Sequence, residues 1–314
     1  MQTIINQFDK ICFQFGADRV AIRTEDSYAG ETEHVYYEIQ ERSKRLAHVL
    51  QKRLGVQKGN IVVIVCDGHS PAEIVGMIAC MRLEGTFVPL SPRLDLLPDI
   101  SSELKPYAAI VVADNDRHPN IQALVNNSIY RCAIVDGAGD LVEASDVGDG
   151  FSPCESSLDT DLYILPTSGS TGKAKFVRGS QKGLLSRVQW CHARYPREGG
   201  AVILRRTPLT FVDSLAEHFT PLLSPTFATL WAPSRHRIGR IDRDFVTIAA
   251  GAACSRITVV PSQLRVLLAC CPNLAELWPS LKLIFVSGEA LSNTLVETFY
   301  KAFPRGTTKL VNLY

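Results

Sequence analysis

Residues 167–175 bring together hydroxyl groups, glycines and lysines at a spacing that could bind phosphate. The segment reads Thr-Ser-Gly-Ser-Thr-Gly-Lys-Ala-Lys. Glycine allows backbone N–H groups to converge on an anion, and lysine offsets the charge of a polyphosphate. An alternative is a solvated Ser/Gly linker, but the segment lies between the apolar run Leu162–Leu165 and the helix-like stretch Gln181–Arg194. Phosphate loops are typical of such junctions, so we predict one here.

Spacing excludes two better-known motifs of similar composition. A P-loop places four residues before its Gly-Lys-Ser/Thr ending, whereas two residues separate Gly169 from Gly172 and Ala174 follows Lys173. A nucleophile elbow requires Gly-x-Ser-x-Gly, and the segment has no serine at that central position. The sequence therefore supports neither a P-loop ATPase nor a serine hydrolase.

Composition predicts a globular protein that binds neither nucleic acid nor a membrane. The chain has 314 residues, of which 46% are hydrophobic and 21% charged, so it can bury a large core. Its formal net charge of +1 gives no electrostatic basis for attraction to a polyanion. The longest apolar runs are too short to span a bilayer, and residues 1–25 lack the pattern of a secretory signal.

The cysteines indicate a reducing compartment. Nine cysteines are scattered through the chain without a Cys-x-x-Cys pair, and this odd number predicts neither a disulfide framework nor a zinc site. The seven histidines do not fall at metal-ligand spacing either. We therefore expect a cytoplasmic protein with no metal-ligating cluster of its own.

Short apolar runs alternate with amphipathic stretches, which predicts an α/β fold with doubly wound, mainly parallel sheets. The predicted strands are Ile61–Val65, Phe87–Leu90, Ala108–Val112, Cys132–Val135, Leu162–Leu165, Val202–Leu204, Ala228–Trp231, Ile257–Val260, Leu283–Val286 and Leu310–Asn312. The predicted helices are Tyr37–Arg53, Ala72–Leu83, Gln181–Arg194, Ser214–Leu223, Asp244–Ala253, Ser262–Cys270 and Asn293–Phe303. Residues 136–161, rich in Gly, Asp and Ser, are either a connection between sub-domains or a long loop. Taken as a connection, they divide the chain into sub-domains 1–150 and 151–314.

Residues 167–175 resemble the phosphate-binding motif of the adenylate-forming enzymes. This superfamily of acyl-CoA synthetases, luciferases and nonribosomal-peptide adenylation domains favours Thr-Ser-Gly-(Ser/Thr)-Thr-Gly-x-Pro-Lys-Gly. Further segments look like other core motifs of the family in the expected order: residues 35–39 with 45–47, 83–92, 209–214, 287–290 and 311–314. The resemblance spans essentially the whole chain and implies the N-terminal core of an adenylate-forming enzyme.

Residues 184–190 and 208–217 look closest to the Ebony-type β-alanyl-amine synthases. In amino-acid-activating domains, an aspartate near the fourth motif holds the substrate ammonium. In this chain Val212 occupies the usual aspartate position and the carboxylate follows at Asp213, a pattern similar to those associated with β-alanine. A β-amino group lies one methylene farther from the activated carboxylate, so its counter-ion must move. The alternative is that Asp213 only caps the following helix.

The resemblance implies ATP and Mg²⁺ as cofactors and an amino acid, with β-alanine favoured, as substrate. The acid would become an aminoacyl-adenylate and pass to a carrier thiol, the phosphopantetheine of a downstream carrier domain, and then to an amine. The implied nucleotide-binding residues are Thr167, Ser168, Gly169, Ser170, Thr171, Gly172, Lys173, Lys175, Gly288, Glu289, Ala290 and Tyr314. The implied substrate-binding residues are Val212, Asp213, Ala216, Ser262, Phe285, Ser287 and Leu313.

The sequence also departs from the family pattern. Ala174 replaces the usual proline and Phe176 a glycine. The sequence stops at Tyr314, before the family's Gly-x-Thr-Glu, and no later segment supplies the C-terminal sub-domain with its catalytic lysine. We therefore expect a truncated core that is inactive alone. Two alternatives stay open: a catalytically silent nucleotide-binding protein, and an acyl-CoA synthetase that acts on another carboxylic acid.

Overall fold

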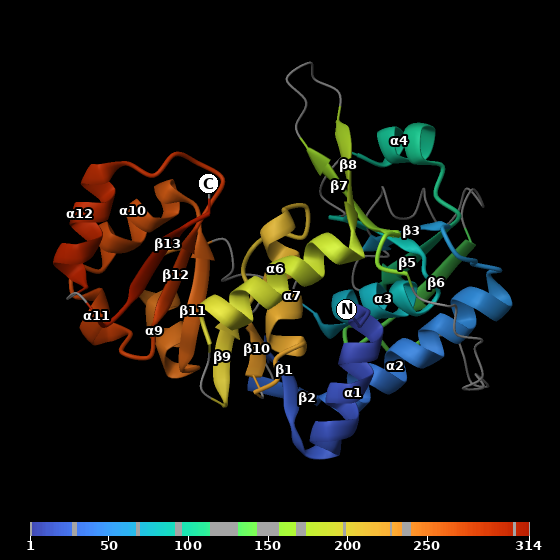
Figure 1. Cartoon of the computed structure of the whole chain (residues 1–314), viewed down its shortest axis with the longest axis horizontal. Helices are drawn as coiled ribbons and strands as arrows, with labels where there is room; N and C mark the ends of the chain where they lie inside the picture. Colours follow the sequence, from blue (N-terminus) through green and yellow to red (C-terminus); the bar gives the residue numbers. More distant parts are fainter. Residues whose placement is uncertain are drawn as a thin grey trace.

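The structure, a computed structural model, consists of two mainly parallel sheets with helices packed against them (Figure 1). It describes residues 2–26, 30–66, 70–91, 96–113, 131–142, 157–167, 174–196, 199–226, 228–233, 240–303 and 306–313. The helices are α1 Ile4–Phe15, α2 Tyr36–His48, α3 Pro71–Arg82, α4 Leu97–Asp99, α6 Gln181–Arg194, α7 Val212–Leu222, α9 Arg243–Gly251, α10 Pro261–Cys270, α11 Leu274–Leu277 and α12 Asn293–Ala302. This architecture confirms the expected α/β class with mainly parallel sheets.

The first sheet has the strand order β6-β5-β3-β4-β7-β8. Its strands are β3 Ile61–Val65, β4 Thr86–Leu90, β5 Ala108–Val112, β6 Arg131–Val135, β7 Asp161–Thr167 and β8 Lys175–Ser180. Strands β3, β4 and β5 are continuous apolar runs, almost wholly buried, as expected for parallel strands that are covered on both faces. Helix α3 begins with Pro71 at its first position, where proline costs little, and all of its residues are buried.

The second sheet has the strand order β13-β12-β11-β9-β10-β1-β2. Its strands are β1 Val20–Asp26, β2 Gly30–Val35, β9 Ala201–Leu204, β10 Ala228–Ala232, β11 Cys254–Val259, β12 Leu283–Val286 and β13 Lys309–Asn312. From β9 the chain runs to β10 on one side and then to β11 on the other, so the strand order reverses between β9 and β11. Ligands of open parallel sheets bind beyond the carboxyl ends of the strands at such a reversal.

Each sheet contains strands from both halves of the sequence. The N-terminal strands β1 and β2 extend the second sheet, because β1 pairs with β10. Strands β7 and β8, which follow residue 150, complete the first sheet. Sheet membership therefore does not coincide with the division into residues 1–150 and 151–314, which stays a prediction as a domain boundary.

A buried charged cluster links the first half of the molecule to the second. The Arg205 guanidinium, directly after β9, donates to both carboxylate oxygens of Glu73 on α3, at 3.0 and 3.2 Å. The His218 imidazole of α7 lies 2.6 Å from the same carboxylate. All three side chains are almost completely inaccessible to solvent. We call these residues the Glu73 cluster; they hold α7 in place against α3.

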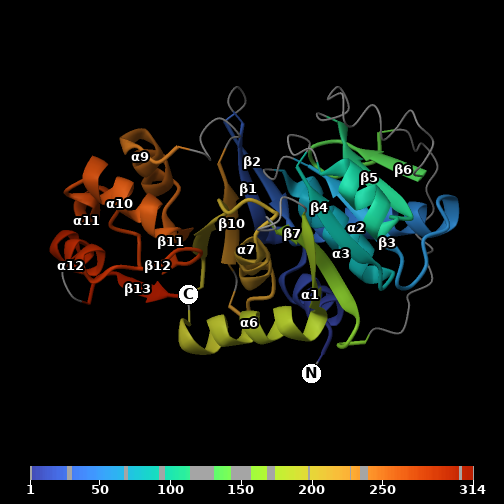
Figure 2. The same ribbon diagram turned by 90° about the horizontal axis from the view of Figure 1, so that it is seen from above.

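Helices α6 and α7 lie side by side in the middle of the molecule (Figures 1 and 2). Helix α6 begins where the Ser180 hydroxyl accepts a hydrogen bond from the Gly183 N–H, at 3.2 Å. Such a cap satisfies a donor that the first helical turn leaves without a partner. Within the described ranges, no helix combines the length and the apolar character that crossing a bilayer requires.

Candidate functional site

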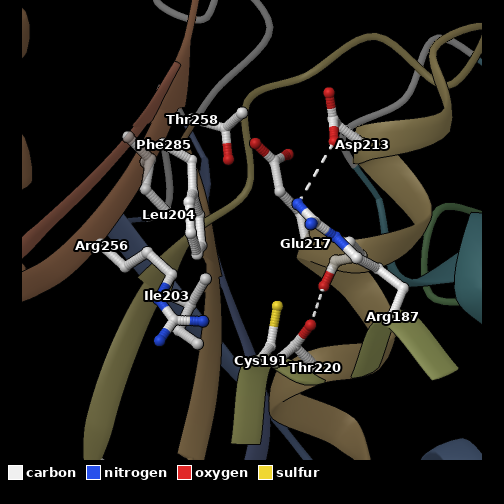
Figure 3. Close-up of a pocket in the computed structure, with 11 residues that line it drawn as sticks. Arg187, Cys191, Ile203, Leu204, Asp213, Glu217, Thr220, Arg256, Thr258 and Phe285 are labelled. Carbon is white, nitrogen blue, oxygen red and sulfur yellow. Dashed lines mark hydrogen bonds and ion pairs between the residues drawn. The ribbon is translucent and has the colours of Figure 1, made fainter. Parts of the chain in front are cut away.

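A small pocket lies between α6, α7 and the face of the second sheet (Figure 3). Its lining residues come from five elements: Arg187 and Cys191 of α6; Ile203 and Leu204 of β9; Asp213, Ala216, Glu217 and Thr220 of α7; Arg256 and Thr258 of β11; and Phe285 of β12. The pocket is therefore built at the reversal between β9 and β11. Its volume of about 10 Å³ accommodates about one water molecule. A larger ligand can enter only if lining side chains move.

Asp213 reaches out of α7 toward the second sheet. Its Oδ2 accepts a hydrogen bond of 2.6 Å from the Ser287 hydroxyl, and its Oδ1 lies 3.7 Å from Nη2 of Arg187. Helix α7 is preceded by Phe211 as its N-cap residue, whose side chain makes no capping hydrogen bond. The side chain of Asp213 thus contacts the sheet and α6 rather than capping the helix. Its carboxylate remains part-exposed, so an incoming cation can reach it.

Two arginines approach the ring of Phe285 inside the pocket. The guanidinium carbon of Arg187 lies 5.6 Å from the ring centroid and that of Arg256 lies 5.2 Å from it. Arg187 also stacks on Trp190, at 4.7 Å. The side chain of Arg256 is held by one hydrogen bond from Nη2 to the carbonyl oxygen of Tyr195, at 3.3 Å. The sequence analysis assigned neither arginine to the site.

Among the residues that the structure describes, Arg256 is a buried cation without a carboxylate partner. The residue is 6% exposed, and no carboxylate of the described residues lies within 4.0 Å of its guanidinium. Burial, together with the neighbouring charge of Arg187, lowers the pKa of Arg256 to about 10, so the side chain is still charged at neutral pH. Burying a cation costs several kcal/mol, whereas a desolvated cation–π contact contributes about 2 kcal/mol. The contact with Phe285 therefore offsets only part of the cost.

The second acidic residue of the pocket, Glu217, is fully engaged elsewhere. Its Oε2 accepts hydrogen bonds from the backbone N–H groups of Arg206 and Thr207, at 3.0 and 2.8 Å. Its Oε1 accepts a hydrogen bond of 2.6 Å from the Thr207 hydroxyl. Glu217 therefore fixes the loop that follows β9, and it does not neutralise Arg256.

A tight turn, residues 287–290, follows β12 at the carboxyl edge of the sheet. Gly288 has φ +82°, a left-handed conformation that favours glycine, and a Cβ atom there would lie 3.4 Å from Val260. The Glu289 carboxylate accepts hydrogen bonds from the backbone N–H and the hydroxyl of Ser262, at 2.9 and 2.8 Å. The turn is thereby tied to the start of α10. Gly288, Glu289 and Ala290 are exposed and leave this backbone open to a ligand.

The central part of the predicted phosphate loop, residues 168–173, lies outside the described residues, as does Tyr314. Its two flanks are described: Thr167 and Lys175 pair across the antiparallel strands β7 and β8, and the Thr167 hydroxyl donates to the Lys175 carbonyl oxygen at 3.2 Å. The sequence analysis expected the loop to lead toward the helix Gln181–Arg194. The structure adds strand β8 between the loop and this helix, α6.

The structure brings four of the predicted acid-binding residues together. Asp213, Ala216 and Phe285 line the pocket, and Ser287 binds Asp213. The other three lie outside its lining: Val212 is 54% exposed, Ser262 contacts Glu289, and Leu313 packs near Phe285. Their roles in substrate binding stay predictions. Within the described part of the chain, no three His, Cys, Asp or Glu side chains gather as a metal site would require.

Comparisons with known proteins agree with this architecture. The chain is 28% identical over 320 residues to the beta-alanyl-bioamine nonribosomal peptide synthetase ebony of Drosophila melanogaster, covering 95% of this chain and 35% of that protein. It is also 28% identical to the zwittermicin A synthase ZmaJ of Bacillus cereus, with 96% of this chain and 56% of ZmaJ covered. The chain thus spans about a third to a half of the length of these relatives.

Solved structures share the fold. The structure of CmiS6 matches 99% of this chain and 71% of its own, with a TM-score of 0.80 and 20% identity. The Klebsiella oxytoca NpsA N-terminal subdomain in complex with 3-hydroxyanthranilyl-AMSN matches 99% of this chain and 72% of its own, with a TM-score of 0.78 and 21% identity. The family described as AMP-binding enzyme matches residues 8–314. Since this match covers almost the whole sequence, the chain belongs to the AMP-binding enzyme family.

Proposed function

We propose that this chain is the adenylation region of a nonribosomal-peptide-synthetase-like ligase that activates an amino acid with ATP. The observation that carries the proposal is the contact between Asp213 and Ser287. It places a part-exposed carboxylate beside the turn 287–290, at the strand reversal where open α/β sheets bind ligands. A carboxylate in a pocket at this edge can hold the ammonium of an amino acid.

The described residues fit a nucleotide beside this carboxylate. The exposed turn 287–290 offers backbone without side-chain cover at Gly288, and Thr167 and Lys175 flank the predicted phosphate loop. ATP would supply the leaving group: the substrate carboxylate would attack the α-phosphorus, the bond from that phosphorus to the oxygen bridging to the β-phosphorus would break, and pyrophosphate would leave, with Mg²⁺ offsetting the phosphate charge. The task of the chain is then to position the acid and to hold the developing charge.

β-Alanine is the amino acid that we propose first. The pair Val212-Asp213 moves the carboxylate one residue along the chain, as a β-amino group requires, and the similar protein ebony is named as a beta-alanyl-bioamine synthetase. The 3.7 Å contact with Arg187 supports a role for Asp213 in binding a cation. A carrier domain with phosphopantetheine would receive the activated acid. All eight described cysteines are free thiols, which supports a cytoplasmic location.

Pyrophosphate exchange into ATP and titration calorimetry test this proposal. We expect exchange that depends on β-alanine in a protein that includes this chain, and binding of β-alanine that weakens in Asp213→Asn. The matched control is Asp161→Asn, which removes an exposed carboxylate whose one ion-pair partner among the described residues is Arg178. ATP binding without exchange would support a silent nucleotide-binding protein instead. Exchange with acids that lack an amine, unchanged in Asp213→Asn, would support an acyl-CoA synthetase.

A further inference from the structure

The charges inside the pocket do not balance locally. The carboxylate of Asp213 is shared between Ser287 and Arg187. The carboxylate of Glu217 accepts hydrogen bonds from the loop after β9. Neither of them lies within 4.0 Å of the guanidinium of Arg256, and no other carboxylate of the described ranges does.

The positive charges of Arg187 and Arg256 also lie close together in this pocket, and this repulsion lowers the stability of the folded chain. Arg187 and Arg256 both approach the ring of Phe285 from different elements, α6 and β11. In a low-dielectric interior, each guanidinium disfavours the charge of the other. An anion bound between or beside them would remove this cost. The guanidinium fork matches the two oxygens of a carboxylate, which it can bind with two parallel hydrogen bonds.

The two charged ends of the pocket lie at different depths. Arg256 pairs in register with Leu283, at the start of β12, whereas Ser287 follows the end of the same strand. Four residues of extended strand span about 13 Å, and the guanidinium of Arg256 is directed at the carbonyl oxygen of Tyr195, which follows α6. Figure 3 shows Asp213 at one end of the pocket and Arg256 toward the other, with Arg187 alongside. A small ligand that carries both an ammonium and an anionic group can therefore contact both ends of the pocket.

We infer that this pocket takes an amino acid with a second carboxylate besides the one that is activated, and that Arg256, assisted by Arg187, binds it. Asp213 and Ser287 hold the ammonium. The inference rests on the proposed function and moves its favoured substrate from β-alanine to a dicarboxylic amino acid such as L-glutamate, in which a side chain separates the second carboxylate from the ammonium. Binding requires Arg187, whose side chain is part-exposed and 3.7 Å from Asp213, to move aside.

Two matched pairs of amino acids test the inference without altering the protein. L-Glutamate and L-glutamine differ in the charge of the side-chain group at nearly equal size, and so do L-aspartate and L-asparagine. Titration calorimetry in the presence of ATP measures each affinity. We expect the dicarboxylic member of at least one pair to bind at least about tenfold more tightly. Quenching of Trp190, which stacks on Arg187, reports occupancy of this pocket, with Trp190→Phe as the background.

Substitutions at Arg256 test the residue itself. We expect Arg256→Met to remove the preference within the pair and Arg256→Lys to retain part of it, because lysine keeps the charge but loses the fork. The matched control is Arg265→Met, which removes an exposed arginine of α10 and leaves the preference unchanged. If Arg256→Met does not fold, the affinities of the paired amino acids for the wild type and for Arg256→Lys test the inference.

The results separate this inference from the proposed function. Equal affinity within both pairs would overturn the inference, and so would a preference that survives in folded Arg256→Met. In either case, binding of β-alanine that weakens in Asp213→Asn would leave the proposed function intact. If neither these four amino acids nor β-alanine binds, both fall.

Discussion

Two buried arginines of the second half of the molecule, Arg205 and Arg256, have opposite surroundings. Arg205 is inaccessible to solvent and donates to both oxygens of Glu73, which also contacts His218. Arg256 is nearly as buried but meets an aromatic ring, a carbonyl oxygen and a second guanidinium. A charge that is fully paired inside the protein stabilises one arrangement of α3 and α7. A charge that is left without a carboxylate is available to a ligand.

The largest effect that this comparison predicts is the loss of the Glu73 carboxylate. Glu73→Gln leaves the Arg205 cation buried without its counter-ion, which costs about 3–5 kcal/mol of unfolding free energy. Urea unfolding measures the change. As a control, Asp161→Asn breaks an ion pair with Arg178 that is about half exposed, and it is expected to cost less than about 1 kcal/mol. A Glu73 variant as stable as this control would contradict the structural role of the cluster.

Asp213→Asn is expected to have the next largest effect, and on binding instead of stability. A hydrogen bond to a charged group contributes about 1.5–3 kcal/mol, so the affinity for β-alanine should fall about 10–100-fold. The unfolding free energy should change by less than about 1 kcal/mol, because the carboxylate is part-exposed. Titration calorimetry and urea unfolding of the same variant measure both. A large loss of stability with unchanged affinity would mean that Asp213, like the Glu73 cluster, stabilises the fold and does not bind the substrate.

Ser287→Ala should weaken binding in the same direction by a smaller factor. The variant removes the hydroxyl that orients Asp213 at 2.6 Å but keeps the carboxylate. A typical hydrogen bond contributes about 1 kcal/mol, which corresponds to about a fivefold loss of affinity for β-alanine. Calorimetry of Ser287→Ala combined with Asp213→Asn checks the coupling: the double variant should lose no more than Asp213→Asn alone.

The smallest effect on stability is predicted for Arg256→Met. Within the described part of the chain this buried cation has no carboxylate partner, so its removal leaves no carboxylate behind, and the unfolding free energy should equal or exceed that of the wild type. Thermal and urea unfolding measure it beside Arg205→Met, which removes the guanidinium that donates to both oxygens of the buried Glu73 carboxylate and should be strongly destabilised. If both variants lose the same stability, the two arginines do not differ in the way that their surroundings indicate.

The core of the fold could be predicted from the sequence because its strands are apolar throughout. Runs such as Ile61–Val65 and Ala108–Val112 are buried on both faces, and this burial is visible in their composition. The strands that the sequence analysis missed lie at sheet edges or beside them. The first four residues of β2 are exposed, and β8 is mostly polar, so neither shows a continuous hydrophobic run.

Only those residues of the candidate site that lie within family motifs could be predicted from the sequence. Asp213 and Ser287 were both assigned to the acid pocket from family motifs, and the structure joins them by a hydrogen bond. Arg187 and Arg256 come from distant segments and meet only in the folded chain. One signal was available: Arg256 directly precedes the predicted strand Ile257–Val260, and the structure includes it in the buried strand Cys254–Val259, where a charged residue requires a reason.

The pairing of β1 with β10 has a consequence for how the protein is made. Ile22 pairs with Leu230, so the N-terminal hairpin leaves the ribosome about 200 residues before its partner strand exists. At ribosomal speeds of about 5–20 residues per second, this delay is roughly 10–40 seconds. Throughout it, β1 presents an unpaired edge that can bind other chains. Early protection of this edge, by a chaperone or by slow translation of the first residues, should therefore govern how much folded protein a cell obtains.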